Sequence, residues 1–270
     1  MTIELGILGA GNMAEAIAGG IIRAGVLDAG QILAADVSPE RRAVFTSKLG
    51  IRAAADNREV AASARTLLLS VKPQQMAGVL GGIADVLGHE ALIVSIAAGV
   101  STRSIEKHLG EAVGWRVIRT MPNTPMLIGQ GIVALARGRN ATLDDAQRAW
   151  RLFEAGATVI EVGEEQLDAV TAVSGSGPAY IFYLVEQMIR AAEDLGLSPE
   201  HSRQLAIRTA LGAATMLSSS QEPPAELRRR VTSPGGTTLA ALTHLEQHDW
   251  AGITVEAIKA AAARSRELGQ

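Results

Sequence analysis

The sequence predicts an α/β protein, with a doubly wound and mostly parallel sheet followed by an all-helical region. Apolar runs alternate with helical patterns over the first part of the chain, and the strand-like runs stop after Gly163. The apolar runs are also continuous, which is typical of parallel strands covered on both faces. Alternation of strands and helices is typical of a doubly wound sheet. We therefore expect two domains, residues 1–163 and residues 164–270.

Turn and capping residues bound the expected elements of the first domain. The first helix, residues 12–24, ends at Gly25. A second helix starts at Ser38-Pro39, and Gly50 ends it. Apolar runs predict strands at residues 3–8, 31–35, 66–71, 91–97, 115–121, 131–136 and 157–162.

Helical patterns fill the second domain. We expect helices at residues 178–195, 199–219, 225–230, 237–246 and 250–267. The second of these is apolar on much of its surface, at Leu205, Ala206, Ala210, Leu211, Ala213, Ala214 and Leu217. A helix that is apolar nearly all round needs packing partners on every side. The pattern therefore predicts a helical homodimer interface.

Composition excludes several classes of protein. The 270 residues carry a net charge of −3, which gives no reason to expect a nucleic-acid or membrane partner. The absence of cysteine excludes disulfides and thiolate chemistry. None of the five histidines has a metal-ligand spacing with carboxylates, so we expect no metal. No signal peptide or membrane-spanning run is evident, and we expect a cytoplasmic protein.

The loop after the first strand has the spacing Gly9-x-Gly11-x-x-Ala14. Gly9 permits a tight turn, Gly11 lets a pyrophosphate approach the backbone, and Ala14 keeps helix and strand close. The helix N-terminus then faces the phosphates. The motif follows a strand and opens a helix, which is the context that a dinucleotide loop requires. The alternative is an ordinary strand–helix turn.

Asp36 ends the second expected strand, where an acidic residue binds the ribose 2′-hydroxyl of NAD. Ser38, Arg41 and Arg42 follow, and they could bind a 2′-phosphate instead. A third interpretation is that Asp36 only caps the turn into Ser38. The residues leave these three interpretations open.

Three further loops follow strands whose carboxyl ends line the ligand crevice of such a sheet. Lys72-Pro73 could contact a cofactor, or the lysine could be solvated at a helix start. The small residues 97–99 leave room for a nicotinamide ribose, or are ordinary packing. In residues 119–125 two prolines hold Asn123 in a rigid loop, which suits substrate positioning or is only a stiff connection.

Two loops in the second domain could bind a small anion. The loop of residues 233–238 opens a helix and carries hydroxyls. Residues 174–178 open the long helix in the same way. For the second loop, helix capping alone is the simpler interpretation.

Together these motifs resemble the pyrroline-5-carboxylate reductases. The matching pieces occur in family order over nearly the whole chain, at residues 9–13, 71–73, 95–100, 119–125, 174–180 and 231–242. The resemblance implies a Rossmann domain, a helical dimerisation domain, and reduction of the cyclic imine pyrroline-5-carboxylate to L-proline. It implies NADPH as cofactor, with NADH as the alternative because Asp36 fits NADPH poorly. The implied partners are a small-molecule substrate and further copies of the chain, as a homodimer or a higher homo-oligomer of dimers.

The resemblance also implies a set of site residues. Thr238 is the expected catalytic residue, which orients the imine nitrogen. The expected substrate-binding residues are Ser176, Ser233, Gly235, Gly236 and Thr237. The expected cofactor-binding residues are Leu8, Gly9, Ala10, Gly11, Asn12, Met13, Asp36, Ser38, Asn57, Ser70, Val71, Lys72, Pro73, Ala97, Ala98, Gly99 and Asn123.

Two other functions remain open at this point. A β-hydroxyacid dehydrogenase would carry a catalytic lysine on the long helix of the second domain, but residues 177–192 contain none. A nucleotide-sensing protein without turnover would not need Thr238 or an intact loop at residues 233–237.

Overall fold

The computed structural model describes residues 3–268, which form two compact units. The first unit contains residues 3–175 and 261–268, and the second contains residues 176–260. The chain thus leaves the first unit once and returns to it. Leu167 and Ala172 are fully buried in the first unit, and Leu167 packs against Ala134 and Ala136 of its sheet. Packing therefore places residues 164–175 with the sheet.

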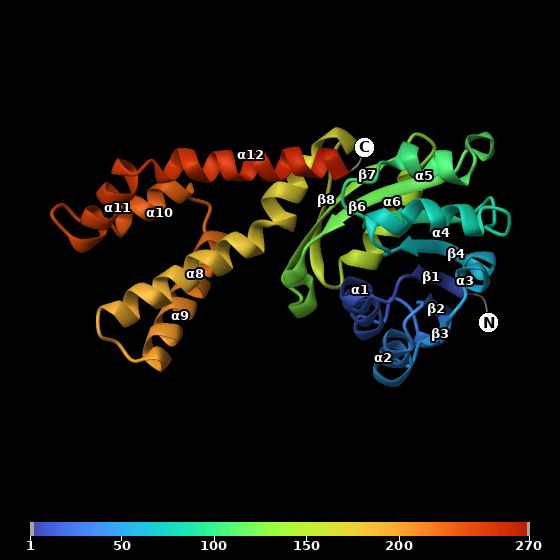
Figure 1. Cartoon of the computed structure of the whole chain (residues 1–270), viewed down its shortest axis with the longest axis horizontal. Helices are drawn as coiled ribbons and strands as arrows, with labels where there is room; N and C mark the ends of the chain where they lie inside the picture. The colour runs from blue at the N-terminus through green and yellow to red at the C-terminus, as the bar shows by residue number, and fades with distance from the viewer. Residues whose placement is uncertain (1–2, 269–270) are drawn as a thin grey trace. The chain divides into compact units, whose positions relative to one another are not determined.

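An eight-stranded sheet forms the centre of the first unit, in the order β3-β2-β1-β4-β5-β6-β7-β8 (Figure 1). All neighbouring strands are parallel except β6 and β7, which confirms the doubly wound, mostly parallel prediction. The strands are β1 (Ile3–Leu8), β2 (Ile32–Ala35), β3 (Arg52–Ala54), β4 (Ala64–Leu69), β5 (Leu92–Ser95), β6 (Arg116–Pro122), β7 (Gly131–Arg137) and β8 (Ala157–Glu161). β3 was not predicted, and β4 ends two residues before the expected strand end at Val71.

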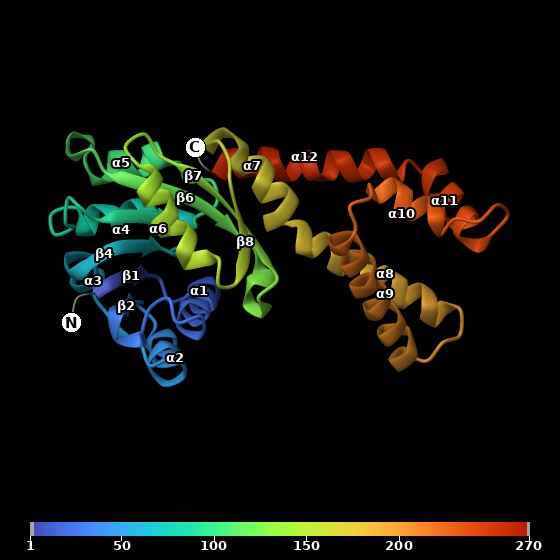
Figure 2. The ribbon, with the colours of Figure 1, turned by 180° about the vertical axis from the view of Figure 1, so that it is seen from behind.

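Helices cover both faces of this sheet. On one face α1 (Asn12–Arg23), α2 (Pro39–Leu49) and α6 (Leu143–Phe153) enclose one apolar cluster. On the other, α3 (Asn57–Ser63), α4 (Met76–Ile83) and α5 (Thr102–Leu109) enclose a second (Figure 2). Leu5 and Ile7 of β1 point into the first cluster and Leu8 into the second. Burial on both faces explains why the strands are continuously apolar.

Short helical segments join these elements. Five are 3-10 helices: η1 (Ala29–Gln31), η2 (Pro73–Gln75), η3 (Glu111–Val113), η4 (Thr124–Ile128) and η5 (Glu164–Gln166). The helix α7 (Leu167–Val170) runs into a π-helix, η6 (Thr171–Gly175). That π-helix ends at the boundary between the two units.

The second unit is helical, as predicted. Its elements are α8 (Gly177–Asp194), α9 (Pro199–Ser219), α10 (Pro224–Arg230), α11 (Thr237–Gln247) and the first part of α12 (Trp250–Leu268). Helices α8 and α9 pack against each other. Leu205, Leu211 and Leu217 of α9 are nevertheless exposed within a single chain. The rest of the chain therefore does not cover the apolar surface from which we predicted a partner.

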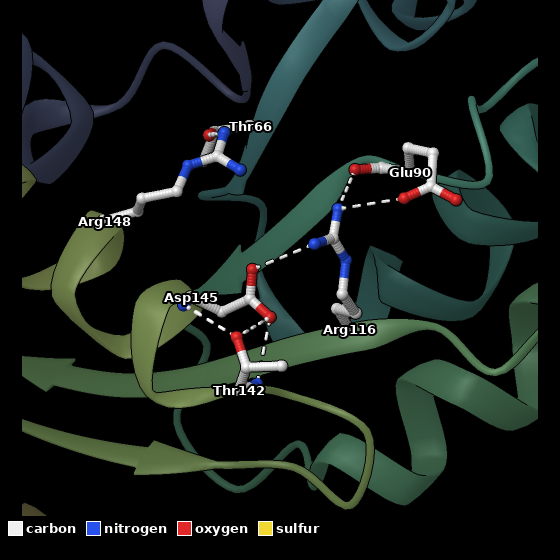
Figure 3. A network of polar contacts seen from close by, with 6 residues as sticks. All are labelled: Thr66, Glu90, Arg116, Thr142, Asp145 and Arg148. Atoms are coloured by element: carbon white, nitrogen blue, oxygen red, sulfur yellow. Dashed lines mark hydrogen bonds and ion pairs between the residues drawn. The ribbon is translucent and has the colours of Figure 1, made fainter.

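A polar network fixes the start of α6 near the amino ends of β5 and β6 (Figure 3). Asp145, which is 1% exposed, accepts hydrogen bonds from the backbone N–H and the hydroxyl of Thr142, both at 2.9 Å. Its second oxygen accepts from Arg116 at 3.2 Å. Arg116 also contacts Glu90, and Arg148 donates to the Thr66 hydroxyl at 3.0 Å.

We expect Asp145→Ala to lower the free energy of unfolding by about 2–3 kcal/mol, because it removes the side chain that completes the capping box with Thr142, together with a charged hydrogen bond, from a buried position. Urea unfolding followed by tryptophan fluorescence measures this. Asp85→Ala is the control, since Asp85 pairs with Arg58 on the exposed surface, where ion pairs contribute little. An equal loss in both variants would show that the network does not fix α6.

Candidate functional site

The loop between β1 and α1 has the geometry of an anion cradle. Gly9 has a φ of +93°, and a Cβ there would lie 2.7 Å from the Ser70 carbonyl oxygen. Gly11 caps α1 in an extended conformation, and a Cβ on it would meet nothing within 4 Å. No side chain caps α1, so the N–H groups of its first turn are available to an anion. A dinucleotide pyrophosphate fits this loop.

A cleft of about 280 Å³ lies beside this loop. Seven of the predicted cofactor residues line it: Gly9, Gly11, Asp36, Asn57, Ser70, Val71 and Lys72. Four residues that sequence reasoning missed also line it: Ala35, Val37, Gln75 and Val79. Gln75 and Val79 follow Lys72 at helical spacing, a signal that could have identified them. The structure thus brings together loops from the ends of β1, β2 and β4.

The other predicted cofactor residues lie outside this cleft. Leu8 and Ala97 are buried in an apolar cluster, so only their backbone can reach a ligand. Asn12 and Met13 form the first turn of α1, while Ser38 and Pro73 start α2 and η2. Ala98 and Gly99 follow β5, where Gly99 has a φ of +78°.

Asp36 is already engaged by the backbone. One carboxylate oxygen accepts from the Ala10 N–H at 2.7 Å, and the other accepts from the Ser38 N–H at 2.8 Å. The predicted turn into Ser38 is therefore present, and Asp36 also ties β2 to the β1–α1 loop. Each carboxylate oxygen has a second lone pair. A ribose hydroxyl can still donate to Asp36.

The two arginines that could bind a 2′-phosphate have partners within the protein. Arg41 donates to the Ala10 carbonyl at 2.6 Å and to Glu15 at 2.9 Å. Arg42 donates to the carbonyls of Asp36 and Val37. Hydrogen bonding to Lys48 and then to Arg41 lowers the pKa of Glu15 below its usual value, despite the opposing effect of burial. These contacts compete with a phosphate for both guanidinium groups.

Lys72 and Asn123 differ in their freedom to bind a ligand. Lys72 is exposed and forms no ion pair within residues 3–268. Asn123 is 8% exposed, and its amide donates to the Ser174 carbonyl at 3.2 Å and accepts from the Ile132 N–H at 3.0 Å. Asn123 thus holds its own loop to β7 and to the π-helix.

The loop before α11 presents free hydroxyls. Gly235 has a φ of +68°, and the Gly236 N–H donates to the Ser233 carbonyl at 3.0 Å. Gly236 caps α11 without a side chain, and no described residue forms a hydrogen bond with the hydroxyl of Thr237 or Thr238. If these threonines only capped the helix, their hydroxyls would form capping hydrogen bonds, and α11 has no side-chain capping bond. Their N–H groups lie in the first helical turn, where no intrahelical acceptor exists.

The serines before α8 behave differently from each other. Ser174 donates to the Val170 carbonyl within the π-helix. Ser176 occupies the N-cap position of α8, but its side chain makes no capping hydrogen bond. Helix capping by this loop therefore has no side-chain hydrogen bond from Ser176 to support it.

Two further observations bear on the class of protein. Within residues 3–268, no group of three or more His, Asp or Glu side chains is placed to hold a metal ion. In the same part of the chain, every helix is too short or too polar to cross a membrane.

We expect Gly11→Val to fold normally and to lose dinucleotide binding, because its side chain would project into open space at the start of α1. Gly9→Val should instead destabilise the fold, since a side chain there meets the Ser70 backbone at a positive φ. Binding by calorimetry and a thermal melt separate the two effects.

Gly81→Val in α4 is the matched control, because Gly81 also faces open space but lies outside the cleft. Unchanged dinucleotide affinity in folded Gly11→Val would remove the loop from the cofactor site.

Comparison with known proteins agrees with this geometry. Residues 4–99 match the family described as NADP oxidoreductase, coenzyme F420-dependent, and residues 164–268 match pyrroline-5-carboxylate reductase dimerisation. The chain is 44% identical to the pyrroline-5-carboxylate reductase of Pseudomonas aeruginosa, covering 100% of this chain and 98% of that one. It is 38% identical to the enzyme of the same name from Synechocystis over the full length of both.

Solved structures show the same relationship. A pyrroline-5-carboxylate reductase from Coxiella burnetii superimposes with a TM-score of 0.90 at 37% identity, covering all of both chains. The Plasmodium falciparum pyrroline carboxylate reductase with NADP bound gives a TM-score of 0.89 at 29% identity, covering 99% of this chain and 98% of that one. With full-length identity of this level and a matching dimerisation region, the chain belongs to the pyrroline-5-carboxylate reductase family.

Proposed function

We propose that the protein reduces pyrroline-5-carboxylate to L-proline with NAD(P)H, the last step of proline biosynthesis, in the cytoplasm. The observation that carries this proposal is the presence of two anion cradles in one chain of this family. One is the Gly9–Gly11 loop at the start of α1, and the other is the loop before α11. A dinucleotide and a small carboxylate substrate need one cradle each.

We assign cofactor binding to residues 1–163, and dimerisation and substrate binding to residues 164–270. The match of residues 164–268 to the family's dimerisation region supports this division. Apolar side chains such as Phe182, Tyr183 and Ile253 are exposed on α8 and α12, and they supply area for a homodimer. The proposed assembly is a homodimer or a higher homo-oligomer of such dimers.

For the cofactor, we assign the pyrophosphate to the N–H groups at the start of α1. Asp36, Asn57, Ser70 and Lys72 line the adjoining cleft and are assigned to the rest of the dinucleotide. Ala97, Ala98, Gly99 and Asn123, at the ends of the next strands, are assigned to its nicotinamide end. When bound, the reduced nicotinamide supplies a hydride. NADPH is the proposed cofactor, with NADH as a second one.

For the substrate, we assign the carboxylate to the N–H groups of Gly235, Thr237 and Thr238, with help from Ser176 and Ser233. The Gly236 N–H is already used within the turn, so Gly236 contributes its backbone conformation. Thr238 forms a hydrogen bond with the ring nitrogen and orients it. A protonated imine is already electrophilic, so positioning contributes more than acid–base catalysis does.

The contacts of the described residues agree with this mechanism better than with the alternatives. α8 runs from Gly177 to Asp194 without a lysine, so it lacks the base of a β-hydroxyacid dehydrogenase. The free hydroxyls of Thr237 and Thr238 have no role in a protein that only senses nucleotides.

The test is an assay of purified protein with pyrroline-5-carboxylate and either NADPH or NADH. The proposal predicts substrate-dependent loss of reduced nicotinamide and formation of proline. Cofactor binding without turnover would favour the nucleotide sensor and reject the reductase.

We expect Asp36→Ser to raise the ratio of kcat/KM for NADPH to that for NADH. The carboxylate repels a 2′-phosphate, and removing its charge removes this penalty. Initial rates with both cofactors measure the ratio. A thermal melt is needed as a control, because Asp36 also accepts two backbone hydrogen bonds. A ratio that stays constant or falls would show that Asp36 does not face the ribose.

We expect Thr238→Ala to lower kcat about ten- to hundredfold, the effect of losing one positioned hydrogen bond of ~1–3 kcal/mol. Cofactor affinity should barely change. Thr237→Ala is the matched variant, and it should mainly raise KM, because Thr237 belongs to the carboxylate cradle. Steady-state kinetics on both variants measure this. A normal kcat for Thr238→Ala would mean that its hydroxyl does not orient the substrate.

A further inference from the structure

The chain passes between the two units twice. It leaves the first unit after Gly175 and returns at Ala261 within α12. The residues between these two points carry the loop before α11, to which we assign the substrate carboxylate. The anchoring of each connection on the first unit therefore constrains the two ends of the segment that carries this loop.

The first connection is anchored through the π-helix, residues 171–175. The Asn123 amide donates to the Ser174 carbonyl at 3.2 Å. A Cβ on Gly175 would lie 2.6 Å from the terminal methyl of Met121, so the backbone there packs directly on that side chain. Ala172 is fully buried beside these contacts. The π-helix is thus fixed to the end of β6 and the loop that follows it.

The second connection is anchored through α12. Ser265 is 3% exposed, and its hydroxyl donates to Asp168 of α7 at 2.7 Å. The same carboxylate oxygen of Asp168 lies 3.8 Å from the guanidinium of Arg119, which is 6% exposed. That guanidinium also lies 3.7 Å from Glu164. Both partners of this buried arginine are carboxylates from the segment that leads into the π-helix.

Glu164 is itself held by the start of α5. Its two oxygens accept from the backbone N–H and from the hydroxyl of Thr102, both at 2.7 Å. The carboxylate that faces Arg119 is therefore fixed in place from a second element of the first unit.

The anchoring residues Arg119 and Met121 of β6, and Asn123 just after its end, share one face. Arg119, Met121 and Asn123 are spaced by two residues, and side chains at this spacing lie on the same side of a strand. α7 and the π-helix are continuous, so Asp168 and Ser174 belong to one helical segment. Arg119 contacts this segment at Asp168, and Asn123 contacts it at Ser174. One strand face therefore carries both connections.

We propose that Arg119, Asp168 and Ser265 form a clasp that fixes both connections to β6, and that they are positioning residues for the reaction. This inference rests on the proposed function, because the clasp matters for catalysis only if the segment between the connections binds the substrate. None of the three residues lines the cofactor cleft. They act by fixing the backbone of the first unit at the two points where the chain passes to and from the second.

The test uses Ser265→Ala, Arg119→Met and Asp168→Asn in the full-length protein. Displacement of a substrate loop lowers the rate of the chemical step, by about ten- to hundredfold for a shift on the order of 1 Å. We expect kcat with pyrroline-5-carboxylate to fall in the first two variants, with dinucleotide Kd unchanged. Asp168→Asn keeps an acceptor for the Ser265 hydroxyl, so its kcat should fall less. Arg137→Met is the matched control, because Arg137 of the neighbouring strand β7 pairs with Glu161 of the edge strand β8 and not with a residue of the clasp.

Hydrogen exchange gives a second readout that does not depend on turnover. We expect amides 171–175 and 261–268 to exchange faster in Ser265→Ala and Arg119→Met than in the wild type or in Arg137→Met. Unchanged exchange would overturn the clasp. Faster exchange with a normal kcat would overturn its positioning role. If the wild-type protein does not turn over the substrate, the proposed function is rejected. Hydrogen exchange would in that case still show whether the three residues hold the two connections.

Discussion

The register of three parallel strands is the constraint on which the candidate site depends. Leu8 of β1 pairs with Ala35 of β2 on one side and with Leu69 of β4 on the other. The three strands therefore end at the same level. Two hydrogen bonds extend this alignment by one residue, from the Gly9 N–H to the Ala35 carbonyl and from the Ser70 N–H to the Leu8 carbonyl, both at 2.8 Å.

This alignment explains the shape of the loops that follow. Because Ser70 continues alongside Gly9, a side chain at Gly9 would meet the Ser70 carbonyl, and only glycine accepts that approach at a φ of +93°. Asp36 then reaches the Ala10 N–H from the neighbouring strand. Nothing lies within 4 Å of the place that a side chain on Gly11 would occupy, so the cradle there is open. Backbone geometry shapes this cleft, and Asp36 and Lys72 are the charged side chains that line it.

Local sequence patterns were sufficient for most of the fold. Strands buried on both faces are continuous apolar runs, and helices such as α2 have a serine cap and a terminal glycine, Ser38 and Gly50. β3 was missed because it has three residues and begins with an exposed arginine, Arg52. The end of β4 was placed too late because Val71, although apolar, already belongs to the loop.

The contacts between distant residues could not be predicted in this way. Asp36 meets Ala10 across 26 positions, and Ser265 meets Asp168 across 97. Neither pair leaves a periodic or motif-like signal, because each depends on how whole elements pack. The π-helix that ends at Gly175 likewise has no distinct residue pattern. The sequence indicated which loops line the cleft, but it did not indicate which hydrogen bonds their residues form.

The most direct test of the proposed chemistry follows the transferred hydrogen. Pyrroline-5-carboxylate is incubated with the purified protein and NADPH carrying deuterium at nicotinamide C4, and the product is analysed by mass spectrometry and NMR. The account predicts proline with one deuterium on the former imine carbon, from one of the two C4 positions only. Proline without deuterium from either position, or no proline, would contradict direct hydride transfer to the imine.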